Sequence, residues 1–113
     1  GATGTMQLAE LALANDPSPE VRIQAMFVFT VHATPEASEQ AINQLLDNPE
    51  VANSPQLLSA VVGALNNLEH GDLNTVARLG ARLQNMALAD YSREALAEIL
   101  ARCLPAGTTP SGG

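Results

Sequence analysis

The chain has 113 residues, which is enough for one domain with a hydrophobic core of its own. Apolar residues form 46% of the chain and charged residues 15%, so it does not have the composition of an acidic disordered tail. Acidic residues outnumber arginines by 12 to 5, lysine is absent, and the net charge is −7. This balance argues against a nucleic-acid groove or an anionic membrane surface as the partner, because both require a basic stripe.

Helix is the expected secondary structure, because alanine and leucine dominate the composition and no segment alternates with a period of two. Residues 1–5 are predicted to be a flexible segment, either a remnant of cloning or of a cut inside a longer protein. The first predicted helix runs from about Met6 to Ala14, and Asn15-Asp16-Pro17 ends it.

The next two helices are predicted from the same opening motif. Ser18-Pro19-Glu20 supplies an N-cap, a proline in the first turn and an acid near the positive end of the helix dipole. This second helix is expected to continue to about His32. Thr34-Pro35-Glu36 repeats the motif and predicts a third helix that ends near Asp47.

The second half of the chain is predicted to hold three more helices. Residues 48–53 are interpreted as a loop that serves as a spacer. Ser54-Pro55 then opens a fourth helix to about Leu68, Asp72 caps a fifth to about Leu88, and Asp90 caps a sixth to Leu104. Residues 105–113, rich in Pro, Gly, Ser and Thr, are expected to be disordered.

The spacing of these helix starts indicates an internal repeat. Alternate helices begin near residues 18, 54 and 90, and the helices between them begin near 35 and 72. A helix–turn–helix unit of about 36 residues, present roughly three times, is typical of an α-solenoid, in which neighbouring units share one core. We therefore expect residues 6–104 to form a single all-α domain of six helices in about three repeats.

Residues 7–29 resemble a HEAT repeat. The family pattern is an apolar helix, a turn with Asp and Pro, and then Pro-x-Val-Arg followed by a small residue, as in Asp16, Pro17, Pro19, Val21-Arg22 and Ala25. The resemblance implies a right-handed HEAT- or armadillo-like solenoid that binds a protein partner through its second helices. It also implies a ladder between the Asp of the turn and the Arg of the second helix, which Arg22 alone cannot extend through this chain.

Residues with catalytic or metal-binding chemistry are sparse. His32 and His70 lie near the ends of different predicted helices, where a favourable charge at a helix C-terminus is the simplest interpretation. Cys103 has no second cysteine and occupies an apolar position of the repeat. We therefore predict that the chain is not an enzyme and holds neither a metal nor a cofactor.

The second predicted helix is apolar on nearly every side. One stripe of this helix is expected to face the core, and it consists of Val21, Ala25, Val28 and Phe29. Three further apolar residues lie outside this stripe, namely Ile23, Met26 and Phe27. Two interpretations stay open at this point: these three are buried within the chain, or they form a surface for a partner or a second copy. We take Ile23, Met26 and Phe27 as candidate partner-binding residues.

Arg78 and Arg82 are four residues apart, so they share one face of the fifth helix. They are either part of a solvated face with local pairs, as Arg93 would form with Glu94 or Glu98, or a small patch for an acidic partner. Residues 1–72 carry a net charge of −8 and residues 73–113 a net charge of +1, so the acidic half of a second copy could be that partner.

These features predict a non-catalytic protein-interaction or scaffold module within a larger protein. Its partner would be a basic protein, favoured by the acidic N-terminal half, or a second copy of the chain. Two alternatives remain open: a carrier that encloses an apolar small molecule or lipid, and a self-assembling unit whose acidic and basic halves stack end to end. Neither a nucleic acid nor a membrane span is expected.

Overall fold

The computed structural model describes residues 18–68 and 72–103. The predicted helix at 6–14, the segment 1–5, His70 and the tail at 105–113 lie outside these ranges. Within them the chain folds into six helices and no strand. The helices are α2 (Pro19–His32), α3 (Pro35–Asp47), α4 (Pro49–Ala52), α5 (Pro55–Leu68), α6 (Leu73–Gln84) and α7 (Asp90–Cys103).

The predicted helix starts are confirmed by their caps. The hydroxyl oxygens of Ser18, Thr34 and Ser54 each accept a hydrogen bond from the backbone N–H three residues on, at 3.4, 3.2 and 3.2 Å. Asp72 Oδ1 accepts from the N–H of Asn74 at 2.9 Å. Each cap satisfies an amide that the helix cannot pair itself, so the local sequence is sufficient to fix where these helices begin.

The prediction of a loop at residues 48–53 was wrong, because Pro49–Ala52 forms the short helix α4. Asn48 Oδ1 accepts from the N–H of Glu50 at 2.9 Å, and Pro49 and Glu50 occupy the first turn. Val51 is buried in the core and anchors this turn. The signals that open the longer helices are therefore all present in this segment.

Two boundaries near the C-terminus also differ from the prediction. Helix α6 ends at Gln84 rather than Leu88, and buried Leu88 belongs to the connection to α7. Asp90 is the first residue of α7 rather than its cap, because the carbonyl of Ala89 accepts the N–H groups of Ser92 and Arg93. Where a helix ends depends on which groups satisfy its last backbone carbonyls. Between α6 and α7 these groups come from a neighbouring helix, so the boundary is set by tertiary contacts.

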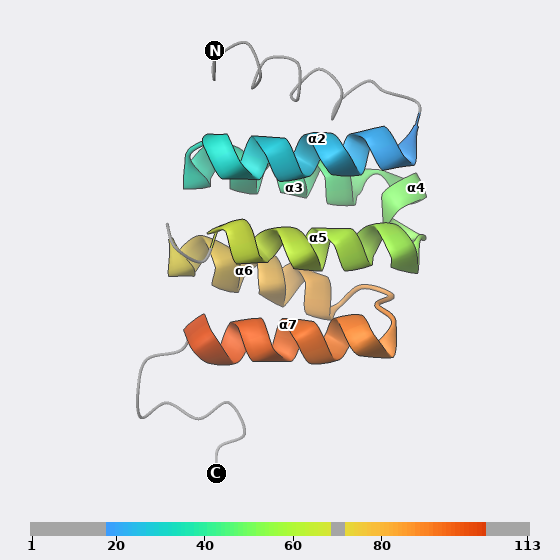
Figure 1. Cartoon of the computed structure of the whole chain (residues 1–113). Coiled ribbons are helices and arrows are strands. Elements are labelled where there is room, and N and C mark those ends of the chain that lie inside the picture. The colour runs from blue at the N-terminus through green and yellow to red at the C-terminus, as the bar shows by residue number, and fades with distance from the viewer. Residues whose placement is uncertain (1–17, 69–71, 104–113) are drawn as a thin grey trace.

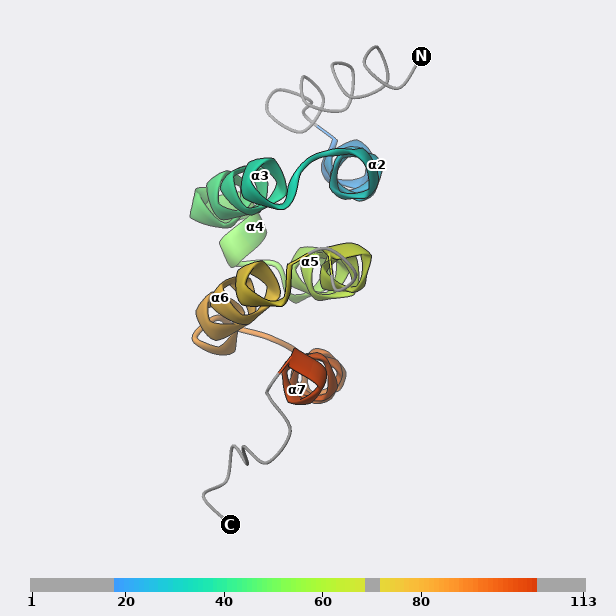
Figure 2. The ribbon, with the colours of Figure 1, turned by 90° about the vertical axis from the view of Figure 1, so that its left-hand side faces the viewer.

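The helices lie in two rows. Figure 2 shows α2, α5 and α7 above one another in one row and α3 and α6 in the other, with α4 between α3 and α5. Figure 1 shows the long helices of the first row lying side by side. Helix α5 is central, because it contacts α2, α4, α6 and α7. No helix in the described parts of the chain is long and apolar enough to cross a membrane.

The core lies between the two rows and is aliphatic. Half of α5 is buried, and its buried residues are Leu57, Leu58, Val61, Val62, Ala64, Leu65 and Leu68. Helices α3 and α6 face it with Ile42, Leu46, Leu79 and Leu83, each at most 2% exposed. Truncating one such leucine to alanine costs about 2–5 kcal/mol, which is a large part of the roughly 5–15 kcal/mol by which a typical domain is stable.

The buried side of α2 is only partly the predicted one. Ala25 and Phe29 are buried, as expected, against Ala33, Ala37 and Ala41. The core positions predicted for Val21 and Val28 are wrong: these side chains are 38% and 36% exposed. Helix α2 packs on α3 and α5 at once, and the buried arc that this creates excludes both valines.

Candidate functional site

The exposed side of α2 carries three valines. Val21, Val28 and Val31 are 38%, 36% and 62% exposed, and together with Gln24 they follow the helical spacing of one face. We call Val21, Val28 and Val31 the valine stripe. Exposed apolar side chains grouped on one helix face are more typical of an interaction surface than single exposed ones.

The α2 residues predicted to bind a partner have different environments. Met26 is completely buried, so it belongs to the core and cannot line a surface of this fold. Ile23 and Phe27 are half-buried and pack against the same core. Phe27 lies at the boundary with α5, beside Gly63, where it is partly open to solvent. Of the three, Ile23 and Phe27 therefore remain able to contact a partner beside the valine stripe.

Helix α5 continues this face without a charge. Its exposed or half-buried residues are small or carry amides, namely Gln56, Ser59, Ala60, Gly63, Asn66 and Asn67. Two of the amides join α5 to its neighbours in the row. Asn67 Nδ2 donates to Thr30 Oγ1 of α2 at 3.2 Å, and Asn66 Oδ1 accepts from Arg102 Nη2 of α7 at 3.3 Å. These bonds hold the three helices side by side. At 3.6 residues per turn, Val28 and Val21 lie about 160° and about 180° around α2 from Thr30, so both point away from α5, whereas Val31 lies between the two directions.

Helix α7 adds an aromatic ring and carboxylates to this face. Tyr91 is 62% exposed, and Glu94, Glu98 and Arg102 follow it at helical spacing. We call these four residues the α7 stripe. Since Arg102 contacts Asn66, the α7 stripe adjoins α5 on the side where the row is open. On this side the row therefore exposes Val31 of α2, the small and amide side chains of α5, and the ring, two carboxylates and guanidinium of the α7 stripe.

Arg78 and Arg82 do not belong to this face. Both lie on the side of α6 that faces α3, in the other row. Arg78 donates from Nε and Nη2 to the two carboxylate oxygens of Glu39, each at 2.8 Å. Arg82 donates to the backbone carbonyl and side-chain oxygens of Asn43 and makes an ion pair with Asp47. Their charges are thus used within the chain, between successive helices of one row.

This charged contact shifts the titration of its members. The hydrogen bonds from Arg78 hold the pKa of Glu39 below its ordinary value and raise that of Arg78 in return. The hydroxyl of Thr75 donates to Asp72 at 3.0 Å and is the main reason why the pKa of that carboxyl is also lowered. All three groups are solvent-exposed enough that the contact has the character of a surface ion pair.

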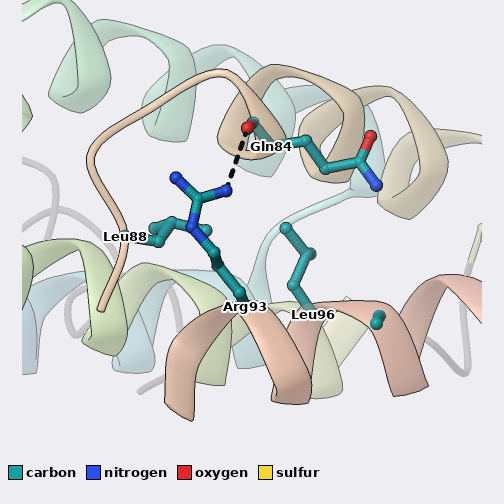
Figure 3. Close-up of a pocket in the computed structure, with 5 residues that line it drawn as sticks. Gln84, Leu88, Arg93 and Leu96 are labelled. Carbon is teal, nitrogen blue, oxygen red and sulfur yellow. Dashed lines mark hydrogen bonds between the residues drawn. The ribbon is translucent and has the colours of Figure 1, made fainter. Parts of the chain in front are cut away.

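The expected pairing of Arg93 with Glu94 or Glu98 was wrong. Its guanidinium donates instead to the backbone carbonyls of Gln84 at 3.4 Å and Met86 at 3.0 Å, and so caps the end of α6. Figure 3 shows the bond from Arg93 to Gln84, with Leu88 and Leu96 nearby. The hollow beside this bond has a volume of about 120 Å³, and it is lined by Gln84, Leu88, Arg93, Leu96 and Ala97. Pockets for drug-sized ligands are roughly 300–1,000 Å³, so this hollow accommodates much smaller molecules.

The other reactive side chains in the described ranges are one cysteine and one histidine. Cys103 is half-buried and packs against the core, and His32 is exposed at the end of α2. Within residues 18–68 and 72–103, no group of three or more His, Cys, Asp or Glu side chains could hold a metal ion. Comparison of the chain with protein-family models, with curated proteins and with solved structures finds no match in any of the three.

Sequence reasoning missed the valine stripe and the α7 stripe. The valines recur at a spacing of seven and three residues, which is a helical signal, but Val21 and Val28 were assigned to the core. The periodicity of α2 gives the angles between its side chains, whereas the buried arc is set by the positions of α3 and α5. The α7 stripe was detectable in the same way, from Tyr91 and the two glutamates that follow it.

Proposed function

We propose that this chain is a HEAT-like α-solenoid that works as a protein-interaction module, with its docking surface on the open face of the α2–α5–α7 row. The observation that carries this proposal is Val31, which is 62% exposed and lies one turn from half-buried Phe27 on the same side of α2. Apolar and aromatic side chains at the centre of a surface supply most of the binding energy of protein interfaces.

Contacts between equivalent helices support the repeat architecture. The bonds Thr30–Asn67 and Asn66–Arg102 join residues 37 and 36 positions apart. In the other row, Arg78–Glu39 and Arg82–Asp47 join residues 39 and 35 positions apart. Separations close to the 36-residue period of the sequence are those expected when each repeat contacts the next one.

The two alternative functions receive less support. A carrier of an apolar ligand needs a cavity of several hundred Å³, whereas the hollow that described residues of α6 and α7 and their connection line is about 120 Å³. End-to-end stacking needs basic groups that are available to a second copy, whereas Arg78 and Arg82 already bind residues of α3. We therefore favour the binding of another protein at the α2–α5–α7 face as the function.

A random-peptide display selection against the whole chain tests this proposal. We expect enriched peptides to bind the wild-type chain and to lose at least about tenfold in affinity when Val28→Ser and Val31→Ser are combined, because apolar area is no longer buried there. Leu73→Ser is the matched control, since Leu73 is 44% exposed but lies on α6 in the other row. Circular dichroism checks that each variant is folded.

Two results would contradict the proposal. Selected peptides that bind the double variant as tightly as the wild type would place the docking surface elsewhere. A selection that enriches no peptide, although the protein is folded and displayed correctly, would argue against a peptide- or protein-binding role for this face.

A further inference from the structure

Val21 and Val28 lie on a side of α2 that the described helices leave open. Around α2 they lie about 180° and about 160° from Thr30, which bonds to Asn67 of α5. They therefore point away from the rest of the row, and they are 38% and 36% exposed. Among the described helices, α2 forms the end of its row, with α5 as its neighbour (Figure 2). We call Val21 and Val28 the outer valine pair.

The same two positions are buried in the next helix of the row. At an offset of 36 residues, the period of the repeat, Val21 corresponds to Leu57 of α5 and Val28 to Ala64. Around α5 these two residues lie about 180° and about 160° from Asn66, which contacts α7. They are 9% and 0% exposed, because α2 packs on α5 from the preceding side of the row. The outer valine pair thus occupies positions that this repeat buries when another helix comes before it.

The rest of this alignment agrees between the two helices. Ala25 of α2 corresponds to Val61 of α5, and Phe29 corresponds to Leu65. All four side chains are buried in the core. The difference between α2 and α5 is therefore confined to the outer valine pair, and a shifted register does not explain it.

The segment before α2 carries a matching apolar side. Residues 6–14, which lie outside the described ranges, are predicted from the sequence to form a helix. Leu8, Leu11 and Ala12 share one side of that predicted helix, and Glu10 lies about 160° from Leu8. The unit at the end of a solenoid needs an apolar inner side and a polar outer side, and this pattern supplies both.

The length and the connection of the segment also fit. A helix of nine residues is about 13.5 Å long, and the members of the outer valine pair, seven residues apart, are separated by about 10.5 Å along α2. Only residues 15–17 and the N-cap lie between the predicted helix and α2. Helices joined by so short a connection pack as antiparallel neighbours. This arrangement places Leu11 near Val21 and Leu8 toward Val28.

We propose that residues 6–14 lie on the outer valine pair and close this end of the helix stack. A segment attached by so short a connection has an effective concentration on the order of millimolar, so it occupies the pair ahead of a helix from another molecule. The inference does not depend on the proposed function. The docking surface proposed above is centred on Val31 and Phe27, which lie about 100° and about 60° from Thr30 on another side of α2.

A double-mutant cycle in the whole chain tests this contact. Leu8→Ala with Leu11→Ala reduces the apolar side of the segment, and Val21→Ala with Val28→Ala reduces the outer valine pair. Unfolding by urea is followed by circular dichroism. We expect the segment variant to raise the equilibrium constant for unfolding by at least about tenfold. In the combined variant this constant should be at least about threefold smaller than the product of the two separate effects predicts, because both pairs of substitutions remove the same contact.

A control and a change of protein concentration make the test specific. Leu73→Ala is the matched control, since Leu73 is 44% exposed but lies on α6 in the other row. Its effect should multiply with that of the segment variant, because the two sites share no contact. The cycle is repeated at a protein concentration about tenfold higher, and a contact within one chain gives the same coupling at both concentrations.

Three results would overturn the inference. A segment variant as stable as the wild type would show that residues 6–14 contribute no packing to the fold. Effects of the segment and valine variants that multiply, as in the control, would place the segment elsewhere on the protein. A coupling that increases with protein concentration would mean that a second copy supplies the helix that covers the outer valine pair.

Discussion

At the scale of single residues, two glycines in mid-helix have opposite surroundings. A Cβ placed on Gly63 of α5 would lie 3.8 Å from Phe27 Cζ, which is an ordinary van der Waals contact. A Cβ on Gly80 of α6 would lie 2.6 Å from Leu100 Cδ2 and 3.4 Å from Leu96 Cδ1. Gly80 therefore allows α6 and α7 to pack closely, whereas at Gly63 no side chain projects from the exposed side of α5.

Alanine substitutions distinguish these two roles. Gly63→Ala should raise the free energy of unfolding by about 0.5–1 kcal/mol, because it reduces the backbone entropy of the unfolded chain at no steric cost. Gly80→Ala should lack this gain and lower stability, since Leu100 must move out of its packed position. Urea unfolding followed by circular dichroism measures both, and equal stabilisation by the two substitutions would contradict this account.

At the scale of helices, most contacts between rows are apolar, and charged groups join successive helices within a row. Glu39 of α3 and Arg78 of α6 form a two-pronged ion pair, and Arg82 adds bonds to Asn43 and Asp47. The pKa of Glu39 is lowered by this contact, so the folded state favours its charged form. The stability of the α3–α6 contact is consequently linked to pH.

The direction of this pH dependence follows from the lowered pKa of Glu39. The stabilisation is fully present above its ordinary pKa of 4.5 and is lost as the pH falls through the lower value of the folded state. We expect the free energy of unfolding, measured by urea titration, to fall less between neutral and low pH for Glu39→Gln than for the wild type. Glu94→Gln on α7 controls for the loss of one negative charge, and an equal change in both variants would rule out the ion pair as the cause.

At the scale of the whole molecule, the α2–α5–α7 row presents a face with exposed carboxylates on α7, and the α3–α6 row presents a second face of paired charges. The second face, on α3 and α6, has its arginines bound to its acids, so it offers little net attraction to a partner. The first face keeps Val31 and the carboxylates of α7 available. A net charge of −7 also disfavours association of two copies.

Light scattering after size exclusion tests this view of the whole molecule. We expect the mass of a monomer, 11.8 kDa, over a wide concentration range at low and at high salt. A dimer that persists in high salt and dissociates with Val28→Ser and Val31→Ser would instead place a second copy on the valine stripe. An oligomer that dissociates in high salt would favour end-to-end stacking of the acidic and basic halves.

Much of the fold could be predicted because its signals are local. A capping side chain and a proline in the first turn act over three or four residues, so Ser18, Thr34, Ser54 and Asp72 mark helix starts in the sequence itself. The same signals at Asn48-Pro49-Glu50 were overlooked because the helix that follows is only one turn long. The end of α6 was not predictable locally, because Arg93 on the next helix supplies its cap.

The sequence by itself determined that the described parts are helical, where most helices begin, and which residue types are available for binding. The tertiary structure decided which sides of those helices are open. Periodicity fixes the angles between side chains on α2, but the positions of α3 and α5 bury Met26 and expose Val28 and Val31. Likewise, only the approach of α6 to α3 shows that Arg78 and Arg82 pair with acids of this chain, because ion pairs depend on distances that sequence spacing does not give.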